Sequence, residues 1–294
     1  MNAVIVRAPA KLNLGLEILG RRDDGYHEIR TVMQTVSIFD QITLAPAPAD
    51  RLSCSIPALA TDQNLAIQAV VLMRDHFGPT PGIHIDLVKA IPTAAGLGGA
   101  SSDAAAVLRG SCTLGSFTCS DPKLQELALQ IGSDVPFFLK GGTMLAEGRG
   151  ERLTALPPLT EVWFVVASPR ISVPNKTRGM YGLLQPRDFS DGSSVTALTE
   201  SIVNRKPIPW DRMVNRFERA ATELFPEIVE MRHTFKRAGA PFVAMTGAGP
   251  SHFTASADPD QAKAIHAGLT RAIGQWAELF LCRPIPAVSP VELV

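Results

Sequence analysis

The segment with the clearest chemistry is IPTAAGLGGASSDAAAVLRG, residues 91–110. Gly96, Gly98 and Gly99 lack a Cβ atom, so the backbone there can adopt positive φ and approach a ligand closely. The run DAAAVL that follows consists of good helix formers, and a Ser or Asp near its start is expected to cap the helix. Free N–H groups and the positive end of the helix dipole would face the loop, and together they favour a bound phosphate.

Two familiar phosphate-binding motifs do not fit this loop. A Walker A loop ends in Gly-Lys followed by Ser or Thr, and the loop contains no lysine. A dinucleotide-binding fingerprint needs a third glycine where this chain has Ser101. On composition alone the segment can also be a tight strand-to-helix connection without a ligand, so both interpretations stay open here.

A second group of candidate residues lies in KLNLGLEI, residues 11–18. Apolar side chains at every second position predict a strand with Lys11 and Asn13 on one face and the leucines on the other. Taken alone, Lys11 is equally well a solvated lysine and Asn13 a surface amide. Asp134 precedes VPFF, and taken alone it is best explained as a helix cap.

The elements that must position these residues follow from periodicity and turn signals. Strands are predicted at 3–7, 12–19, 29–38, 41–44, 82–88, 162–168 and 276–283, with a hairpin at 141–156 and a strand–glycine turn–strand unit at 240–256. Helices are predicted at 63–77, 121–132, 174–184, 194–204, 210–221, 225–238 and 258–273, with Asp121 as the cap of the second. Because strands and helices do not alternate strictly, we predict an α+β fold, divided into domains at 1–158 and 159–294.

Composition narrows the class of protein. The 294 residues suffice for a large core, and 28 basic residues balance 28 acidic ones, so no net field steers the chain onto nucleic acid or a membrane. The four cysteines, Cys54, Cys112, Cys119 and Cys282, lack zinc-site or C-x-x-C spacing. We expect reduced thiols in a cytoplasmic protein without a signal peptide.

The segment PTAAGLGGASSDAA resembles the nucleotide-binding motif of the galactokinase, homoserine kinase, mevalonate kinase and phosphomevalonate kinase (GHMP kinase) superfamily. Members hold ATP phosphates on a glycine-rich loop at a helix N-terminus, without a Walker lysine. The resemblance implies a two-domain α+β fold with the active site in the interdomain cleft. It also implies ATP contacts for Pro92, Thr93, Ala94, Ala95, Gly96, Leu97, Gly98, Gly99, Ala100, Ser101 and Ser102. Ala94 and Ala100 stand where relatives often have glycine.

Further segments are similar to one family within that superfamily, the 4-diphosphocytidyl-2-C-methyl-D-erythritol kinases. They are APAKLNLGLEILGRRDDGYHE at 8–28 and IGSDVPFFLKGGTMLAEGRGE at 131–151, while MTGAGPSHF at 245–253 resembles the superfamily's third glycine-rich motif. The first is the most specific, since other superfamily kinases do not usually join K-x-N to G-Y-H. The resemblance implies ATP-dependent phosphorylation of the 2-hydroxyl of this small molecule, in non-mevalonate isoprenoid synthesis, with Mg²⁺ accompanying ATP.

The resemblance also implies residue roles. Asp134 would accept the hydroxyl proton beside Lys11, whose ammonium would keep the carboxylate ionised and offset charge on the moving phosphoryl group. Asn13 would bind the substrate or Asp134. Tyr26 and His27 would contact the cytosine, although neighbours on a regular strand point to opposite faces; the alternative is an edge-strand tyrosine beside an exposed histidine.

The segment ISVPNKTRGMYGLL, residues 171–184, adds Thr177 and Tyr181 as candidate substrate-binding residues on one helical face. Ordinary packing of an amphipathic helix is the alternative for Tyr181. Asn215 is a weaker site candidate, because Arg216 stands where relatives often have an acid. No pair of carboxylates stands out as a metal site. Ser102 is a candidate metal ligand.

Two other functions would fit a nucleotide-binding loop of this kind. Another kinase of the superfamily, acting on mevalonate or homoserine, would lack the cytosine-reading Tyr26, His27 and Tyr181. A nucleotide-binding regulator without catalysis would not need Lys11 and Asp134. The sequence favours the cytidyl kinase over both.

Overall fold

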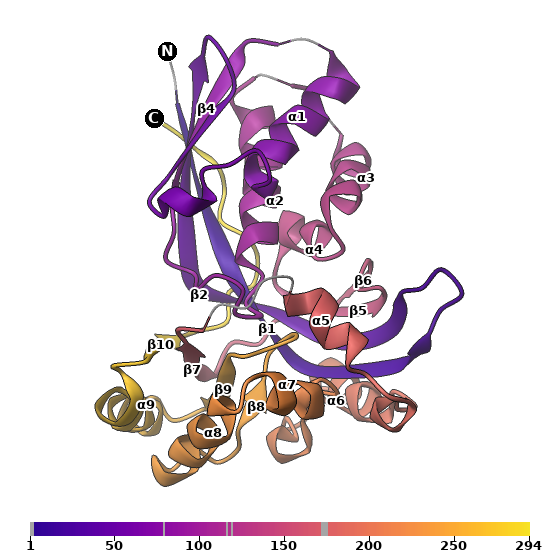
Figure 1. Ribbon diagram of the computed structural model, residues 1–294, viewed down its shortest axis with the longest axis vertical. Helices are drawn as coiled ribbons and strands as arrows, with labels where there is room; N and C mark the ends of the chain where they lie inside the picture. Colours follow the sequence, from indigo (N-terminus) through magenta and orange to yellow (C-terminus); the bar gives the residue numbers. More distant parts are fainter. Residues whose placement is uncertain (1–2, 79, 116, 119, 172–175) are drawn as a thin grey trace.

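The computed structural model describes residues 3–294 except 79, 116, 119 and 172–175 (Figure 1). The strands are β1 (Val4–Arg21), β2 (His27–Ala47), β3 (Arg51–Cys54), β4 (Gly82–Val88), β5 (Thr143–Gly148), β6 (Arg152–Ala155), β7 (Trp163–Pro169), β8 (Ala244–Met245), β9 (His252–Ser256), β10 (Ala277–Cys282) and β11 (Glu292–Leu293). The α-helices are α1 (Leu65–Phe77), α2 (Gly99–Thr113), α3 (Asp121–Ile131), α4 (Val135–Lys140), α5 (Lys176–Gly182), α6 (Ser193–Val203), α7 (Glu218–Leu224), α8 (Glu227–Arg237) and α9 (Pro259–Ile273). Short 3₁₀ turns lie at η1 (Pro57–Leu59), η2 (Pro186–Asp188) and η3 (Trp210–Arg212).

Two sheets organise these elements. The larger has the order β11-β1-β2-β4-β3, with β5 paired to β2 and β6 to β5, and the smaller has the order β10-β7-β9-β8. Among the named strands, β3 and β4 run parallel and the other pairs are antiparallel. Helices therefore do not alternate with parallel strands, and the predicted α+β class is confirmed. The division near 158 falls between β6 and β7, yet β11 returns to the larger sheet, so the domain boundary itself stays a prediction.

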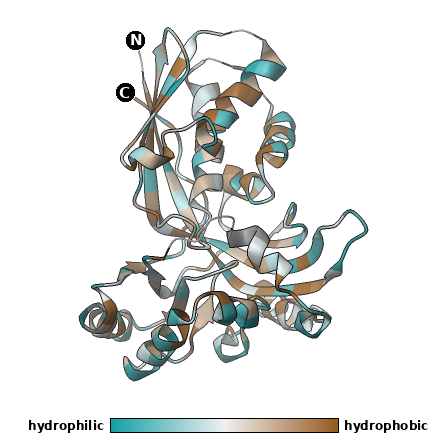
Figure 2. Ribbon diagram, viewed as in Figure 1, coloured by the Kyte–Doolittle hydropathy of each residue, from teal (hydrophilic) through white to brown (hydrophobic). Residues whose placement is uncertain are grey.

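The first two strands form one long hairpin, where shorter separate strands were predicted. The ladder of β1 and β2 continues through register shifts at Pro9/Ala10, Asn13/Gly15 and Ile18/Gly20. Such bulges absorb a proline or a break in alternation without ending the strand, which explains why the local pattern looked interrupted. The loop joining the two strands is hydrophilic and projects from the body of the molecule at the right of Figure 2.

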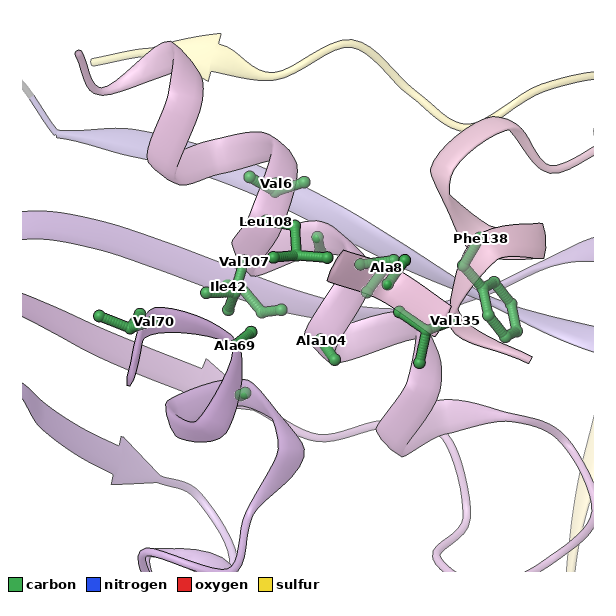
Figure 3. Packing of buried hydrophobic residues seen from close by; sticks show 14 of the residues in the cluster. Val6, Ala8, Ile42, Ala69, Val70, Ala104, Val107, Leu108, Val135 and Phe138 are labelled. Atoms are coloured by element: carbon green, nitrogen blue, oxygen red, sulfur yellow. The ribbon is translucent and has the colours of Figure 1, made fainter. Parts of the chain in front are cut away.

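Helices α1, α2 and α4 pack on one face of the larger sheet. Figure 3 shows the contacts among side chains of β1, β2 and these helices, with labels on Val6, Ala8, Ile42, Ala69, Val70, Ala104, Val107, Leu108, Val135 and Phe138. Each Val or Leu fully buried there contributes about 1.5–3 kcal/mol. Small residues on α2 let it approach the sheet closely, since a Cβ on Gly110 would lie 2.6 Å from Leu44 Cδ1. The helix that follows the glycine loop is thereby held firmly on the sheet.

Several local predictions need correction. Ser120, not Asp121, is the N-cap residue of α3. The predicted helix at 210–221 is instead the turn η3 followed by α7, because Asn215 forms a bridge to Leu16 and leaves the helical path. Cys112 is disulfide-bonded, so the expectation of reduced cysteines is wrong for that residue. Among the described helices, none combines the length and apolar character that a membrane crossing requires.

Candidate active site

The glycine loop connects β4 to α2 as the sequence indicated, but the helix is not capped by a side chain. Its N-cap residue is Gly98, in the left-handed region at φ 75°, with no side-chain capping bond. The expected Ser or Asp cap is therefore wrong: Ser101, Ser102 and Asp103 all lie inside the first turns of the helix. A glycine cap has no side-chain oxygen that could accept the first-turn N–H groups, so these groups can bind a ligand.

The third glycine segment packs directly against this loop. A Cβ on Gly96 (φ 82°) would lie 2.3 Å from the carbonyl oxygen of Thr246. The Thr246 hydroxyl donates to the Gly96 carbonyl oxygen at 3.3 Å and accepts from the Asn13 N–H at 3.0 Å. A Cβ on Gly247 would lie 2.9 Å from the Gly96 oxygen and 3.2 Å from Lys11 Nζ. The glycine loop and the third glycine segment therefore meet beside Lys11. They can lie this close because glycine has no side chain.

Lys11 and Asn13 do share one face of β1. The Lys11 ammonium donates to Asn13 Oδ1, and Asn13 Nδ2 donates to Thr31 Oγ1 at 2.9 Å. Both residues are buried, with exposed fractions of 3% and 4%. The alternatives of a solvated lysine and a surface amide are wrong, and the amide orients the ammonium.

Asp134 faces the same ammonium. Its Oδ2 lies 3.9 Å from Lys11 Nζ, and its side chain is 37% exposed. Asp134 occupies the N-cap position of α4, yet its side chain makes no capping bond, so the carboxylate is available for another partner. Burial lowers the pKa of Lys11 below its ordinary value, and the charge of Asp134 partly offsets this effect.

An aromatic group lies beside this pair. The rings of His27 and Tyr181 stack with centroids 5.0 Å apart, and Phe217 meets Tyr181 edge-on at 4.9 Å. Burial raises the pKa of Tyr181, and the Asp134 charge adds to this effect, which places the phenol near the catalytic candidate. The pKa of His27 is lowered by burial and by the charge of Arg21, which favours a neutral imidazole.

Tyr26 lies in the bend before β2, and His27 is the first residue of β2, so the two are not neighbours on one regular strand. Tyr26 is 53% exposed, and the Arg149 guanidinium lies 4.6 Å from the centroid of its ring. His27 packs on Tyr181 instead. The two adjacent rings thus contact different partners. Thr177 belongs to α5, but its side chain lies outside the described part of the chain.

A buried cluster of charged side chains, Lys89, Asp40 and Asp103, holds the two ends of the glycine loop. The sequence analysis did not predict this cluster. Lys89 pairs with Asp40 and, at 2.6 Å, with Asp103. Asp40 Oδ1 also accepts the backbone N–H groups of Ala90 and Ile91 at 2.6 and 2.8 Å. Burial raises the pKa of Asp103 to about 8, against the lowering effect of Lys89. No local pattern joins residues so distant in sequence, so only the fold reveals the cluster.

Asn215 supports the third glycine segment. Its Nδ2 donates to the carbonyl oxygens of Met245 and Gly247 at 2.8 and 2.9 Å, and its Oδ1 accepts from the Phe217 N–H. The amide therefore holds the backbone that approaches Lys11. The Nε of neighbouring Arg216 is buried, with no hydrogen-bond partner among the residues that the structure describes.

The comparisons with known proteins agree with this fold. The family model for the GHMP kinases N terminal domain matches residues 64–142, and that for the GHMP kinases C terminal matches residues 198–274. The fold is that of a GHMP kinase. A crystal structure of a homoserine kinase from Cytophaga hutchinsonii, 16% identical, has the same fold with a TM-score of 0.78, covering 99% of this chain and 97% of that one.

More similar proteins narrow the assignment. A 4-diphosphocytidyl-2-C-methyl-D-erythritol kinase of Dehalococcoides mccartyi is 42% identical over 265 residues, 89% of this chain and 92% of that one. The enzyme of the same name from Bacillus subtilis is 38% identical, covering 85% and 87%. A crystal structure of a 4-(cytidine 5'-diphospho)-2C-methyl-D-erythritol kinase superposes with a TM-score of 0.78 at 35% identity, covering 97% and 99%. The chain belongs to the 4-diphosphocytidyl-2-C-methyl-D-erythritol kinase family.

Proposed function

We propose that this protein transfers the γ-phosphoryl group of ATP to the 2-hydroxyl of 4-diphosphocytidyl-2-C-methyl-D-erythritol, in the non-mevalonate route to isoprenoid precursors. The observation that carries the proposal is the Lys11–Asp134 pair, 3.9 Å apart, between the glycine loop and the aromatic group. Both substrates are charged, nucleotide-linked metabolites, which fits the cytoplasmic location inferred from the sequence.

Asp134 acts as the proton acceptor. As the substrate oxygen forms its bond to the γ-phosphorus, the bond from that phosphorus to the β-bridging oxygen breaks and ADP leaves. The hydroxyl proton passes to Asp134, whose carboxylate is not occupied in helix capping. Lys11, oriented by Asn13, offsets the negative charge on the transferred group. Phosphoryl transfer depends mainly on such positioning and electrostatics.

The loop of residues 92–102 holds the ATP phosphates. Gly98 caps α2 without a side chain, so first-turn N–H groups and the helix dipole are directed at the anion. Gly96 and Gly247 bring the loop and the third segment together at Lys11. This contact supports a transfer path that runs from the loop to Asp134.

The donor set suits a magnesium ion that travels with ATP. Ser102 Oγ and Asp103 Oδ1 are buried oxygen atoms for which the described residues supply no hydrogen-bond partner, and they lie within the first turns of α2. Mg²⁺ prefers oxygen ligands and keeps several of its waters. Bound beside the phosphates, it would neutralise charge there, with Ser102 as the protein ligand.

The aromatic group reads the cytosine. His27 and Tyr181 supply a stacked pair, Tyr26 supplies an exposed ring, and Thr177 lies one turn before Tyr181 on α5. Aromatic rings stack on a base, while a neutral imidazole hydrogen-bonds its edge. Mevalonate and homoserine have no base, so this group favours the cytidyl acceptor.

The test is a phosphoryl-transfer assay with Mg-ATP that compares the cytidyl substrate, mevalonate and homoserine, for the wild type and Asp134→Ala. We expect turnover of the cytidyl compound alone, with loss in the variant. Turnover of another acceptor would contradict the cytosine assignment. ATP binding without turnover of any acceptor would instead indicate a regulator.

A further inference from the structure

We infer that Arg149 binds the diphosphate of the cytidyl substrate and holds it between the cytosine and Asp134. The inference rests on the proposed function, since a substrate with a nucleoside diphosphate supplies the ligand. It adds a positioning residue to the site, and this residue lies outside the glycine loop.

Arg149 lies in the turn between β5 and β6, next to the proposed proton acceptor. A Cβ built on Gly150 would lie 3.7 Å from Asp134 Oδ1, so the turn passes directly beside the carboxylate. The turn is fixed by two hydrogen bonds. The Gly150 N–H donates to the Glu147 carbonyl oxygen at 3.0 Å, and the Arg149 N–H donates to the Glu151 carboxylate.

The side chain of Arg149 reaches from this turn to the proposed cytosine end. Its guanidinium carbon lies 4.6 Å from the centroid of the Tyr26 ring. A substrate that places its cytosine at the aromatic group and its hydroxyl at Asp134 must pass its diphosphate through the interval between them. Arg149 lies along that same interval, since the next residue, Gly150, lies beside Asp134 and the Arg149 guanidinium lies over Tyr26.

The charge of Arg149 is available to an anion. Within the described part of the chain, no carboxylate lies within ion-pairing distance of its guanidinium. The positive charge of Arg149 is only a minor cause of the lowered pKa of Asp24. Neighbouring arginines differ: Arg30 pairs with Glu147 at 3.0 Å, and Arg152 pairs with Glu28 at 2.7 Å. A guanidinium donates two parallel hydrogen bonds to phosphate oxygens, which makes it well suited to a diphosphate.

The test measures calorimetric binding of cytidine, CDP and a non-hydrolysable ATP analogue to the wild type, Arg149→Met and Arg152→Met. The expected result is that Arg149→Met weakens CDP binding about ten- to hundredfold, the range for a lost charge-assisted hydrogen bond. Cytidine and ATP-analogue affinities should stay at wild-type values. Arg152→Met, a matched change on the same hairpin, should bind all three ligands as the wild type does.

Three outcomes would overturn the inference. Equal loss of cytidine and CDP binding in Arg149→Met would assign the residue to support of the Tyr26 ring. Loss of ATP-analogue binding would assign it to the donor, and unchanged CDP binding would leave it no role in this site. Failure of the proposed function looks different, because the wild type itself would then bind neither cytidine nor CDP.

Discussion

The ammonium of Lys11 lies 3.9 Å from the carboxylate of Asp134, with the lysine buried and the aspartate open to solvent. This difference in exposure gives the two charged groups different roles. The buried cation is fixed by Asn13, whereas the exposed carboxylate can accept a proton from an incoming hydroxyl and pass it to water. The pair therefore combines a fixed positive charge with an accessible base.

Asp134→Asn should lower kcat for the cytidyl substrate by about 10²–10⁴-fold, the usual contribution of a positioned general base. ATP affinity should not change, because the glycine loop is untouched. Steady-state kinetics with a parallel ATP-binding titration checks both, and Asp62→Asn, at an exposed position, is the control. An unchanged kcat would show that the lysine and the loop suffice without a base.

The buried Lys11 should limit activity at alkaline pH. Burial lowers its pKa below the ordinary value of 10.5, so the charge is lost at a lower pH than for an exposed lysine. As pH rises, we therefore expect kcat to begin falling at a pH below 10.5. Lys11→Arg keeps its charge across the range, so its lower activity should lack this limb. A pH profile of kcat for both proteins tests this expectation. An identical alkaline fall in kcat in both proteins would assign the titration to another group.

Asp103 should make stability depend on pH. Its folded-state pKa of about 8 exceeds the ordinary 3.8, so the folded protein holds the proton more tightly than the unfolded chain. The free energy of unfolding should therefore fall as pH rises from the ordinary value towards the folded one. Asp103→Asn holds no such proton and should remove this slope. Urea unfolding on either side of the range measures the effect, and equal slopes in both proteins would disprove it.

The two alanines of the glycine loop should respond oppositely to glycine. Ala94 has φ 52°, in a region that costs an L-residue roughly 1–2 kcal/mol. Ala94→Gly should therefore stabilise the protein by about 0.5–1 kcal/mol, after the extra backbone entropy of glycine is deducted. Ala100 lies inside α2, so Ala100→Gly should cost about 1 kcal/mol. Thermal unfolding of both variants tests this difference in sign, and destabilisation by both would contradict it.

Gly96→Ala should disrupt the junction of the two glycine segments. The new Cβ would lie 2.3 Å from the Thr246 carbonyl oxygen, and backbone cannot move away cheaply, so we expect a loss of more than about 2 kcal/mol and weaker ATP binding. Gly239→Ala is the control, since its φ is +84° with nothing within 4 Å. The control should show only the strain of about 1–2 kcal/mol and normal ATP binding. Equal effects in both variants would mean that the close contact is unimportant.

Local patterns predicted much of this molecule because much of it is decided locally. The alternation in KLNLGLEI placed Lys11 and Asn13 on one face, and β4, the loop and α2 follow in the predicted order. The roles of the individual site residues are predictions that the experiments above test.

The features that were missed depend on distant contacts. Lys89 meets Asp40 across 49 positions of sequence, and no periodicity marks such a pair. The helix predicted at 210–221 breaks because Asn215 bonds to carbonyl groups 30 and 32 positions away. Gly98 replaces a side-chain cap where the fold leaves N–H groups open. In each case tertiary contacts overrode a sound local preference.

The projecting tip of the β1–β2 hairpin has a consequence for enzyme engineering. The tip carries Tyr26, while Lys11 lies well back along β1, anchored among the two sheets. Under the proposed function, a library that varies residues 22–26 is therefore expected to change which acceptor is recognised without altering the transfer chemistry. Under the same proposal, acceptor scope and phosphoryl donation could evolve separately in this architecture.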